Sequence, residues 1–121
     1  MRYEISQKFY FEAAHTLHRT IDAEGSRRIH GHTYHAEVAL SGTPSLESGM
    51  VVDLAILRRE IERVRDALDH RFLDEIAELG PATLENLCAF IGKRLSQSLP
   101  SVIRVRVMRP ASGDSCTLHI E

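Results

Sequence analysis

The residues best able to do chemistry gather in one short stretch, residues 29–35 (Ile-His-Gly-His-Thr-Tyr-His), with His15 upstream. Strand side chains alternate between two faces, so His30 and His32 project from the same face if this stretch is extended. Gly31 between them leaves the other face open, which suits a close approach to the backbone. Two imidazoles on one face and a third from a neighbouring segment are the ligand set of a catalytic zinc site with one open coordination position.

Two further histidines compete as ligands. His35 falls on the opposite face of the strand from His30 and His32, which argues against it. His18 follows His15 by three residues in a polar segment, and only geometry can exclude it.

An acid–histidine pair, Asp69-His70, falls at the end of a predicted helix. One interpretation is structural, because a histidine near a helix C-terminus interacts favourably with the helix dipole. The other is catalytic, because a carboxylate can orient an imidazole for general acid–base work. Glu85 has a structural interpretation as a first-turn acid at a helix N-terminus, and Asp53 one as a helix N-cap.

The elements that position these residues follow from the pattern of apolar side chains. Residues 2–14 and 29–41 alternate and predict two long strands. Antiparallel pairing of these strands would bring His15 close to His30 and His32. Residues 16–28 show no period and are predicted to form a long loop, and loops of that length in a small domain are often functional.

The second half of the chain predicts two helices and then two strands. Apolar residues at helical spacing mark residues 54–68, and a second helix begins after Thr83 and stops at Pro100. Residues 103–107 and 116–120 alternate as strands. The order is ββααββ, which predicts an α+β fold with a four-stranded antiparallel sheet and two helices on one face.

Composition limits the function classes. The 121 residues predict a single domain spanning 1–121. The net charge is −2 and the arginines are interspersed with acids, so the sequence has no basic patch of the kind that binds nucleic acid. No apolar run spans a bilayer, and the N-terminus has no signal-peptide pattern. The two cysteines, Cys88 and Cys116, form no disulfide framework, so we expect a reduced, cytoplasmic protein.

Five motifs occur in an order and at distances that resemble the 6-pyruvoyl-tetrahydropterin synthase and 6-carboxy-tetrahydropterin synthase family. They are Phe11-Glu-Ala-Ala-His15, His30-Gly-His32, Gly49-Met-Val-Val-Asp53, Leu68-Asp-His70 and Ala82-Thr-Leu-Glu-Asn86. The resemblance covers nearly the whole chain. It implies a T-fold subunit whose trimers close a barrel and stack as a homohexamer, which fits long strand edges that must be protected.

The resemblance also implies roles for individual residues. His15, His30 and His32 would bind Zn²⁺, and Asp69 with His70 would form the acid–base pair. Family active sites lie between subunits, so this pair and the Thr83-to-Glu85 segment would serve a zinc site on a neighbouring chain. The implied substrate is 7,8-dihydroneopterin triphosphate or a related pterin, and the implied reaction is that of a lyase.

Two positions depart from the family pattern. Ser26 stands where the family has its proton-abstracting cysteine, and a hydroxyl is a far weaker acid than a thiol. Arg109 stands where the family has a glutamate that accepts hydrogen bonds from the pterin, and arginine offers only donors. Asp114 would supply the acid if the hairpin register differs.

The sequence therefore predicts a zinc lyase acting on a pterin-like substrate. The alternative is a diverged homologue that binds or transforms another small, anionic molecule, since Arg109 favours a carboxylate, phosphate or carbonyl-rich ligand. A third possibility, a metal-free structural module, would be excluded by stoichiometric zinc.

Overall fold

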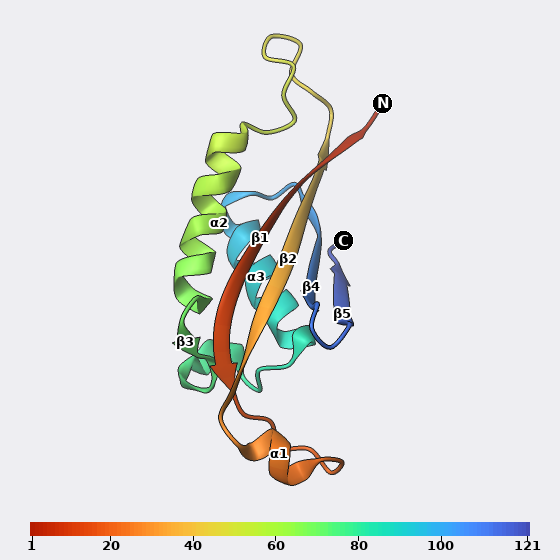
Figure 1. The fold of residues 1–121 in the computed structure, drawn as a ribbon. Coiled ribbons are helices and arrows are strands. Elements are labelled where there is room, and N and C mark those ends of the chain that lie inside the picture. Colours follow the sequence, from red (N-terminus) through yellow and green to blue (C-terminus); the bar gives the residue numbers. More distant parts are fainter.

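The computed structural model describes all 121 residues and arranges them as one mixed sheet with two long helices (Figure 1). The strands are β1 (Tyr3–His15), β2 (His30–Gly42), β3 (Arg71–Phe72), β4 (Val102–Arg109) and β5 (Asp114–His119). Their order across the sheet is β3-β1-β2-β4-β5. The helices are α1 (Ala23–Arg27), α2 (Leu54–Leu68) and α3 (Leu84–Ser98). Two short 3₁₀ turns, Leu73–Glu75 and Ala77–Leu79, connect β3 to α3.

The predicted α+β class is confirmed, but the four-stranded antiparallel sheet is wrong in one respect. A fifth strand, β3, pairs parallel to the end of β1, with Ala13 opposite Arg71 and Ala14 opposite Phe72. Two residues are too few to show a period, so the sequence pattern cannot reveal this strand. The predicted loop over residues 16–28 likewise contains the five-residue helix α1.

β1 and β2 form an unbroken antiparallel ladder that runs from Tyr3 opposite Gly42 to His15 opposite His30. The predicted alternation is real, because the inward side chains of Phe11 and Tyr34 are fully buried and stack with ring centroids 5.0 Å apart. The ladder places its histidines at one end of the sheet, beside α1 (Figure 1).

The two long helices begin at the predicted caps. The Asp53 carboxylate accepts a hydrogen bond from the Ala55 N–H at 2.9 Å, and the Thr83 hydroxyl accepts one from the Asn86 N–H at 3.1 Å. Each cap satisfies an N–H group that has no partner inside its helix. The second cap fixes the segment that precedes α3, which reaches the candidate site.

The apolar faces of α2 and α3 pack against the sheet to form the hydrophobic core. Gly92 lets α3 approach the sheet closely, since a Cβ there would lie 3.1 Å from Ile120 Cδ1. No helix of the chain has the length and apolar character needed to cross a bilayer.

Candidate metal centre

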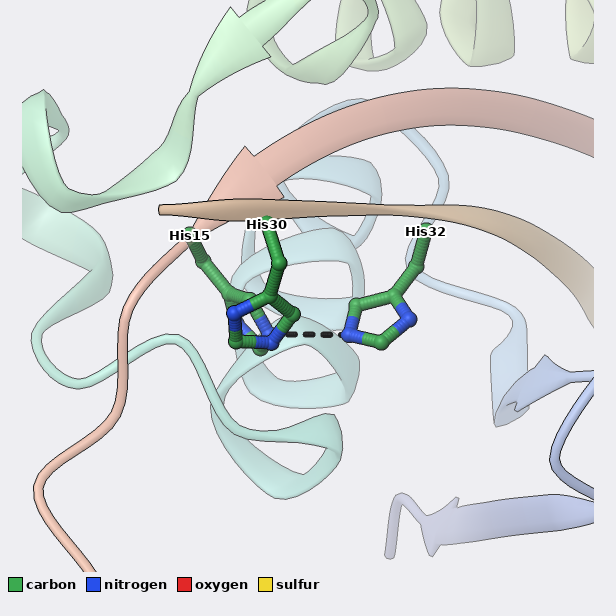
Figure 2. Close-up of side chains that lie close together, drawn as sticks. All are labelled: His15, His30 and His32. Carbon is green, nitrogen blue, oxygen red and sulfur yellow. Dashed lines mark hydrogen bonds between the residues drawn. The ribbon is translucent and has the colours of Figure 1, made fainter. Parts of the chain in front are cut away.

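Three imidazoles meet where β1 ends and β2 begins. Figure 2 shows His15, His30 and His32 extending to the same side of the ladder. Their ligand atoms all lie within 4.8 Å of one another, and His15 Nε2 and His32 Nε2 are 3.0 Å apart. His15 is only 1% exposed, and the other two are partly buried. The juxtaposition predicted from strand pairing is therefore confirmed.

Two backbone carbonyls orient the triad. The Nδ1 atoms of His15 and His30 lie 2.9 Å from the Ala82 carbonyl and 2.8 Å from the Arg28 carbonyl. A neutral imidazole that donates its Nδ1–H to a carbonyl leaves Nε2 as its only lone pair. Metal-bound histidines are commonly held in this way by an outer partner.

The triad fits a zinc ion. Tetrahedral zinc, with Zn–N bonds of about 2.0–2.1 Å, separates neighbouring ligand nitrogens by roughly 3.3 Å. The 3.0 Å between His15 and His32 is close to that separation. A contact this short needs a proton or a metal ion between the two nitrogens, because two lone pairs would repel. Three protein nitrogens would leave the fourth position for water or substrate.

Burial favours the neutral form of His15 and His32, which is the protonation state that metal binding requires. The pKa of His32 is lowered to about 4, mainly by burial and to a lesser extent by the neighbouring His15 and the Arg109 guanidinium. Burial is also the main cause of the lowered pKa of His15, although its hydrogen bond with Ala82 opposes the shift.

Ser26 lies beside the triad, as the sequence predicts. It lines a cavity of about 310 Å³ together with His30 and His32. Ser26 is 5% exposed, and its hydroxyl donates to the Ala23 carbonyl at 3.1 Å within α1. No histidine or carboxylate accepts its proton, so nothing in the chain activates this hydroxyl as a base or nucleophile.

Arg109 and Asp114 line the same cavity. They face each other in the β4–β5 register, and Arg109 Nη2 donates to Asp114 Oδ2 at 3.0 Å. The Ser112 hydroxyl donates to the same oxygen at 2.8 Å. Asp114 therefore brings a carboxylate to this cavity without any shift of the hairpin.

Asp69 and His70 form an oriented pair away from the triad cavity. Asp69 Oδ1 accepts the Glu12 N–H at 3.0 Å, and Asp69 Oδ2 lies 2.9 Å from His70 Nδ1. The His70 side chain is 76% exposed, and its backbone φ is 58°, in the left-handed region that non-glycine residues rarely occupy. His70 and His32 both line an open groove of about 500 Å³ that also exposes Gly31.

Of the remaining predicted site residues, neither Thr83 nor Glu85 lines the triad cavity. The Thr83 hydroxyl caps α3, and Glu85 is exposed in the first turn of that helix. The competing ligands stay outside the triad, since His18 is exposed in the connecting segment and His35 stacks on Tyr10 across the ladder.

Two partners of the triad are not among the residues predicted for the site. The carbonyl that binds His15 belongs to the backbone of Ala82, so the residue types of the sequence do not predict this hydrogen bond. The Tyr34 ring lies 5.6 Å from that of His32 between centroids. Its place two residues after His32 on the same strand face was the available signal for this contact.

The fold and the site together define an α+β protein with a three-histidine metal centre at one end of its sheet. The family model described as 6-pyruvoyl tetrahydropterin synthase matches residues 4–120. The chain belongs to this family.

Individual relatives carry different activities. A dihydroneopterin monophosphate aldolase of Pyrococcus furiosus is 29% identical over 121 residues, covering 100% of this chain and 99% of that protein. A 6-carboxy-5,6,7,8-tetrahydropterin synthase of Synechocystis is 32% identical over 120 residues, covering 93% and 87%. The structure of the Caenorhabditis elegans 6-pyruvoyl tetrahydropterin synthase superimposes with a TM-score of 0.86 at 28% identity, covering 100% and 97%.

Proposed function

We propose that this chain is a zinc-dependent lyase that acts on dihydroneopterin triphosphate or a related pterin. The observation that carries the proposal is the convergence of His15, His30 and His32, with two of them fixed by carbonyl groups. Each of the three relatives is named for a pterin, and this chain covers 99%, 87% and 97% of them in the order given above. Zinc held there would act as a Lewis acid on substrate oxygens and so acidify the adjacent carbon-bound proton.

The proton transfer itself is assigned to His70. Asp69 holds the Nδ1 side of the ring, so Nε2 is the atom left to accept or release a proton. Because the ring is exposed and Asp69 and His70 do not line the triad cavity, His70 serves the triad of a neighbouring subunit. Thr83 and Glu85 would approach the substrate across the same boundary, in a homohexamer built from two trimers.

Turnover of defined pterins tests the proposal. Zinc-loaded protein is assayed with dihydroneopterin triphosphate, dihydroneopterin monophosphate and sepiapterin. His70→Ala is expected to lower turnover about 10²- to 10⁴-fold, the usual contribution of a general acid–base residue. His35→Ala, which alters an exposed histidine outside the triad, is the matched control and should retain activity. Absence of turnover with all three pterins in zinc-loaded protein would contradict the proposal.

Substitutions of Ser26 test whether the reaction depends on this position, as it would in an enzyme with a catalytic cysteine there. Its hydroxyl is committed to the Ala23 carbonyl, so Ser26→Ala should leave most of the activity intact. Ser26→Cys should raise turnover if the scaffold still places a pterin beside this position, because a thiol ionises far more readily.

Arg109 favours a second candidate function, chemistry on an anionic molecule other than the family's pterins. The guanidinium faces the triad cavity where a carboxylate is expected. If only Ser26→Cys combined with Arg109→Glu gains turnover of the three pterins, this second function replaces the first.

A further inference from the structure

The segment that carries the acid–base pair also docks along the end of β1, beside a histidine of the triad. Asp69 Oδ1 accepts the Glu12 N–H at 3.0 Å, and the His70 N–H donates to the Glu12 carbonyl at 2.6 Å. β3 then pairs with the next two residues of β1. Beyond β3, Asp74 reaches the residue that follows His15. Residues 69–74 therefore follow β1 past the point where the strand ends.

Asp74 holds Thr16 with both oxygens of its carboxylate. Its Oδ1 accepts the Thr16 N–H at 3.0 Å, and its Oδ2 accepts the Thr16 hydroxyl. Thr16 comes directly after the last pair of the β1–β2 ladder, His15 opposite His30, so its N–H lies outside the ladder. Hydrogen bonds to an ionised carboxylate are roughly twice as strong as those between neutral groups. Asp74 thus fixes the backbone where the end of a strand would otherwise fray.

His15 is held from two directions as a result. Its Nδ1 lies 2.9 Å from the Ala82 carbonyl, and the residue after it is fixed by Asp74. Asp74, Thr16 and Ala82 line one cavity of about 510 Å³, and none of the three lines the cavity of His30 and His32. Asp74 can therefore act on the metal centre only through His15, and not by contact with a ligand in the triad cavity.

The position of His15 matters because metal coordination tolerates little displacement. Zn–N bonds are about 2.0–2.1 Å long, so a ligand ring that turns away no longer binds. Groups that orient the ligands from outside typically change metal affinity by about 10- to 100-fold.

We infer that Asp74 is a positioning residue for the metal centre, which through Thr16 fixes the backbone that aims His15 Nε2 at the metal. The inference deepens the proposed function, on which it rests for the metal. It also gives residues 69–74 two tasks, because the same segment carries the acid–base residue His70 and supports a metal ligand.

Zinc affinity tests the inference without any turnover. Competition with a chelator should show that Asp74→Ala binds zinc roughly 10- to 100-fold more weakly than the unaltered protein. Glu75→Ala, at the next, exposed position of the same 3₁₀ turn, is the matched control and should bind zinc normally. Asp74→Asn keeps an acceptor for the Thr16 N–H, so it should recover part of the affinity.

A double-mutant cycle tests the route through Thr16. Thr16→Val removes the hydroxyl but keeps the N–H, so it should weaken zinc binding less than Asp74→Ala does. Added to Asp74→Ala, it should cause little further loss, because the two residues act through one contact.

The ring of His15 gives a readout that a general loss of stability would not change. In metal-free protein, ¹⁵N NMR should show the Nδ1–H tautomer that the Ala82 carbonyl selects. Asp74→Ala should show a mixture of tautomers. Asp53→Ala removes a helix cap away from the triad, and it should keep the single tautomer even though it unfolds at a lower temperature.

The outcomes separate this inference from the proposed function. Equal zinc affinity in Asp74→Ala and Glu75→Ala, or an unchanged His15 tautomer in Asp74→Ala, overturns the inference even when pterins turn over. Zinc binding without pterin turnover overturns the proposed function, while the affinities of the variants still decide the role of Asp74. Absence of zinc binding in the unaltered protein overturns both.

Discussion

At the scale of single residues, hydrogen bonds to carbonyl groups and burial prepare the triad for a metal. The Ala82 and Arg28 carbonyls fix the ring orientations of His15 and His30, and burial removes the competing proton from His32. A metal ion would therefore not have to displace a proton from His32 at neutral pH, which strengthens binding.

The first prediction concerns the titration of His32. In metal-free protein its protonation midpoint should lie near pH 4, because burial disfavours the charged ring. Between pH 4 and 6.5 the unfolded chain then binds more protons at this residue than the folded chain. Stability of the metal-free protein should therefore rise with pH across that window and fall on acidification. An NMR titration of the ring resonances checks the midpoint, and a value near 6.5 would contradict it.

The second prediction concerns Asp69. Its hydrogen bond from the Glu12 N–H is the main cause of its lowered pKa. The stabilisation is present above the usual aspartate pKa of 3.8 and is lost as pH falls through the lowered folded value. Asp69→Ala should cost about 1–3 kcal/mol at pH 7, as for hydrogen bonds to charged groups.

Urea unfolding at pH 7 and at pH 3 measures this effect. The difference between Asp69→Ala and the unaltered protein should shrink at the lower pH. Asp66→Ala, at an exposed position in the last turn of α2, is the control and should cost less than about 0.5 kcal/mol. Equal losses for the two variants would show that the Glu12 hydrogen bond contributes little.

At the scale of elements, the N-terminus of α3 couples folding to the metal centre. The Thr83 cap fixes the start of the helix, and the Ala82 carbonyl directly before it holds His15. Loss of the Thr83 cap should therefore shift the Ala82 carbonyl, which is one residue away, and with it the orientation of His15.

The third prediction compares two caps. Thr83→Ala and Asp53→Ala each remove a hydrogen bond from a helix N-terminus and should each cost about 0.5–2 kcal/mol. Only Thr83→Ala should also weaken zinc affinity, since only that cap adjoins a partner of the triad. Thermal unfolding and competition with a zinc chelator measure the two quantities. Equal zinc affinity in both variants would show that the Ala82 carbonyl does not position His15 for the metal.

Helices and strands long enough to repeat their apolar pattern could be predicted from the sequence. Shorter elements could not. The alternation of Phe11, His15, His30 and Tyr34 is imposed by the buried face of the ladder, so it predicts both strands and the meeting of the histidines. Helix α1 and strand β3 are too short to show a period, and they form because tertiary contacts hold them. For the same reason the hydrogen bond between Ser26 and the Ala23 carbonyl lay outside sequence analysis.

At the scale of the whole molecule, the Asp69–His70 pair lies outside the cavity that Ser26 shares with His30 and His32, although His70 and His32 line one open groove. In the proposed homohexamer, His70 serves the triad of a neighbouring subunit, so a complete site would need two copies of the chain. Sedimentation velocity should give a species of six subunits.

The fourth prediction follows from this division. His70→Ala and His32→Ala should each be inactive alone, because one lacks the acid–base residue and the other a metal ligand. Mixing the two after partial dissociation should restore part of the activity, since some sites would combine an intact triad with an intact His70. Activity that stays absent in verified mixed oligomers would place both groups within one subunit's site.

The proposed zinc chemistry depends on the triad, so zinc stoichiometry tests the central claim most directly. Protein purified with zinc and then dialysed should retain one zinc ion per chain by elemental analysis. The single variants His15→Ala, His30→Ala and His32→Ala should each retain far less, whereas His18→Ala and His35→Ala should retain the full amount. Zinc retained equally by the triad variants, or no zinc in the unaltered protein, would contradict the account.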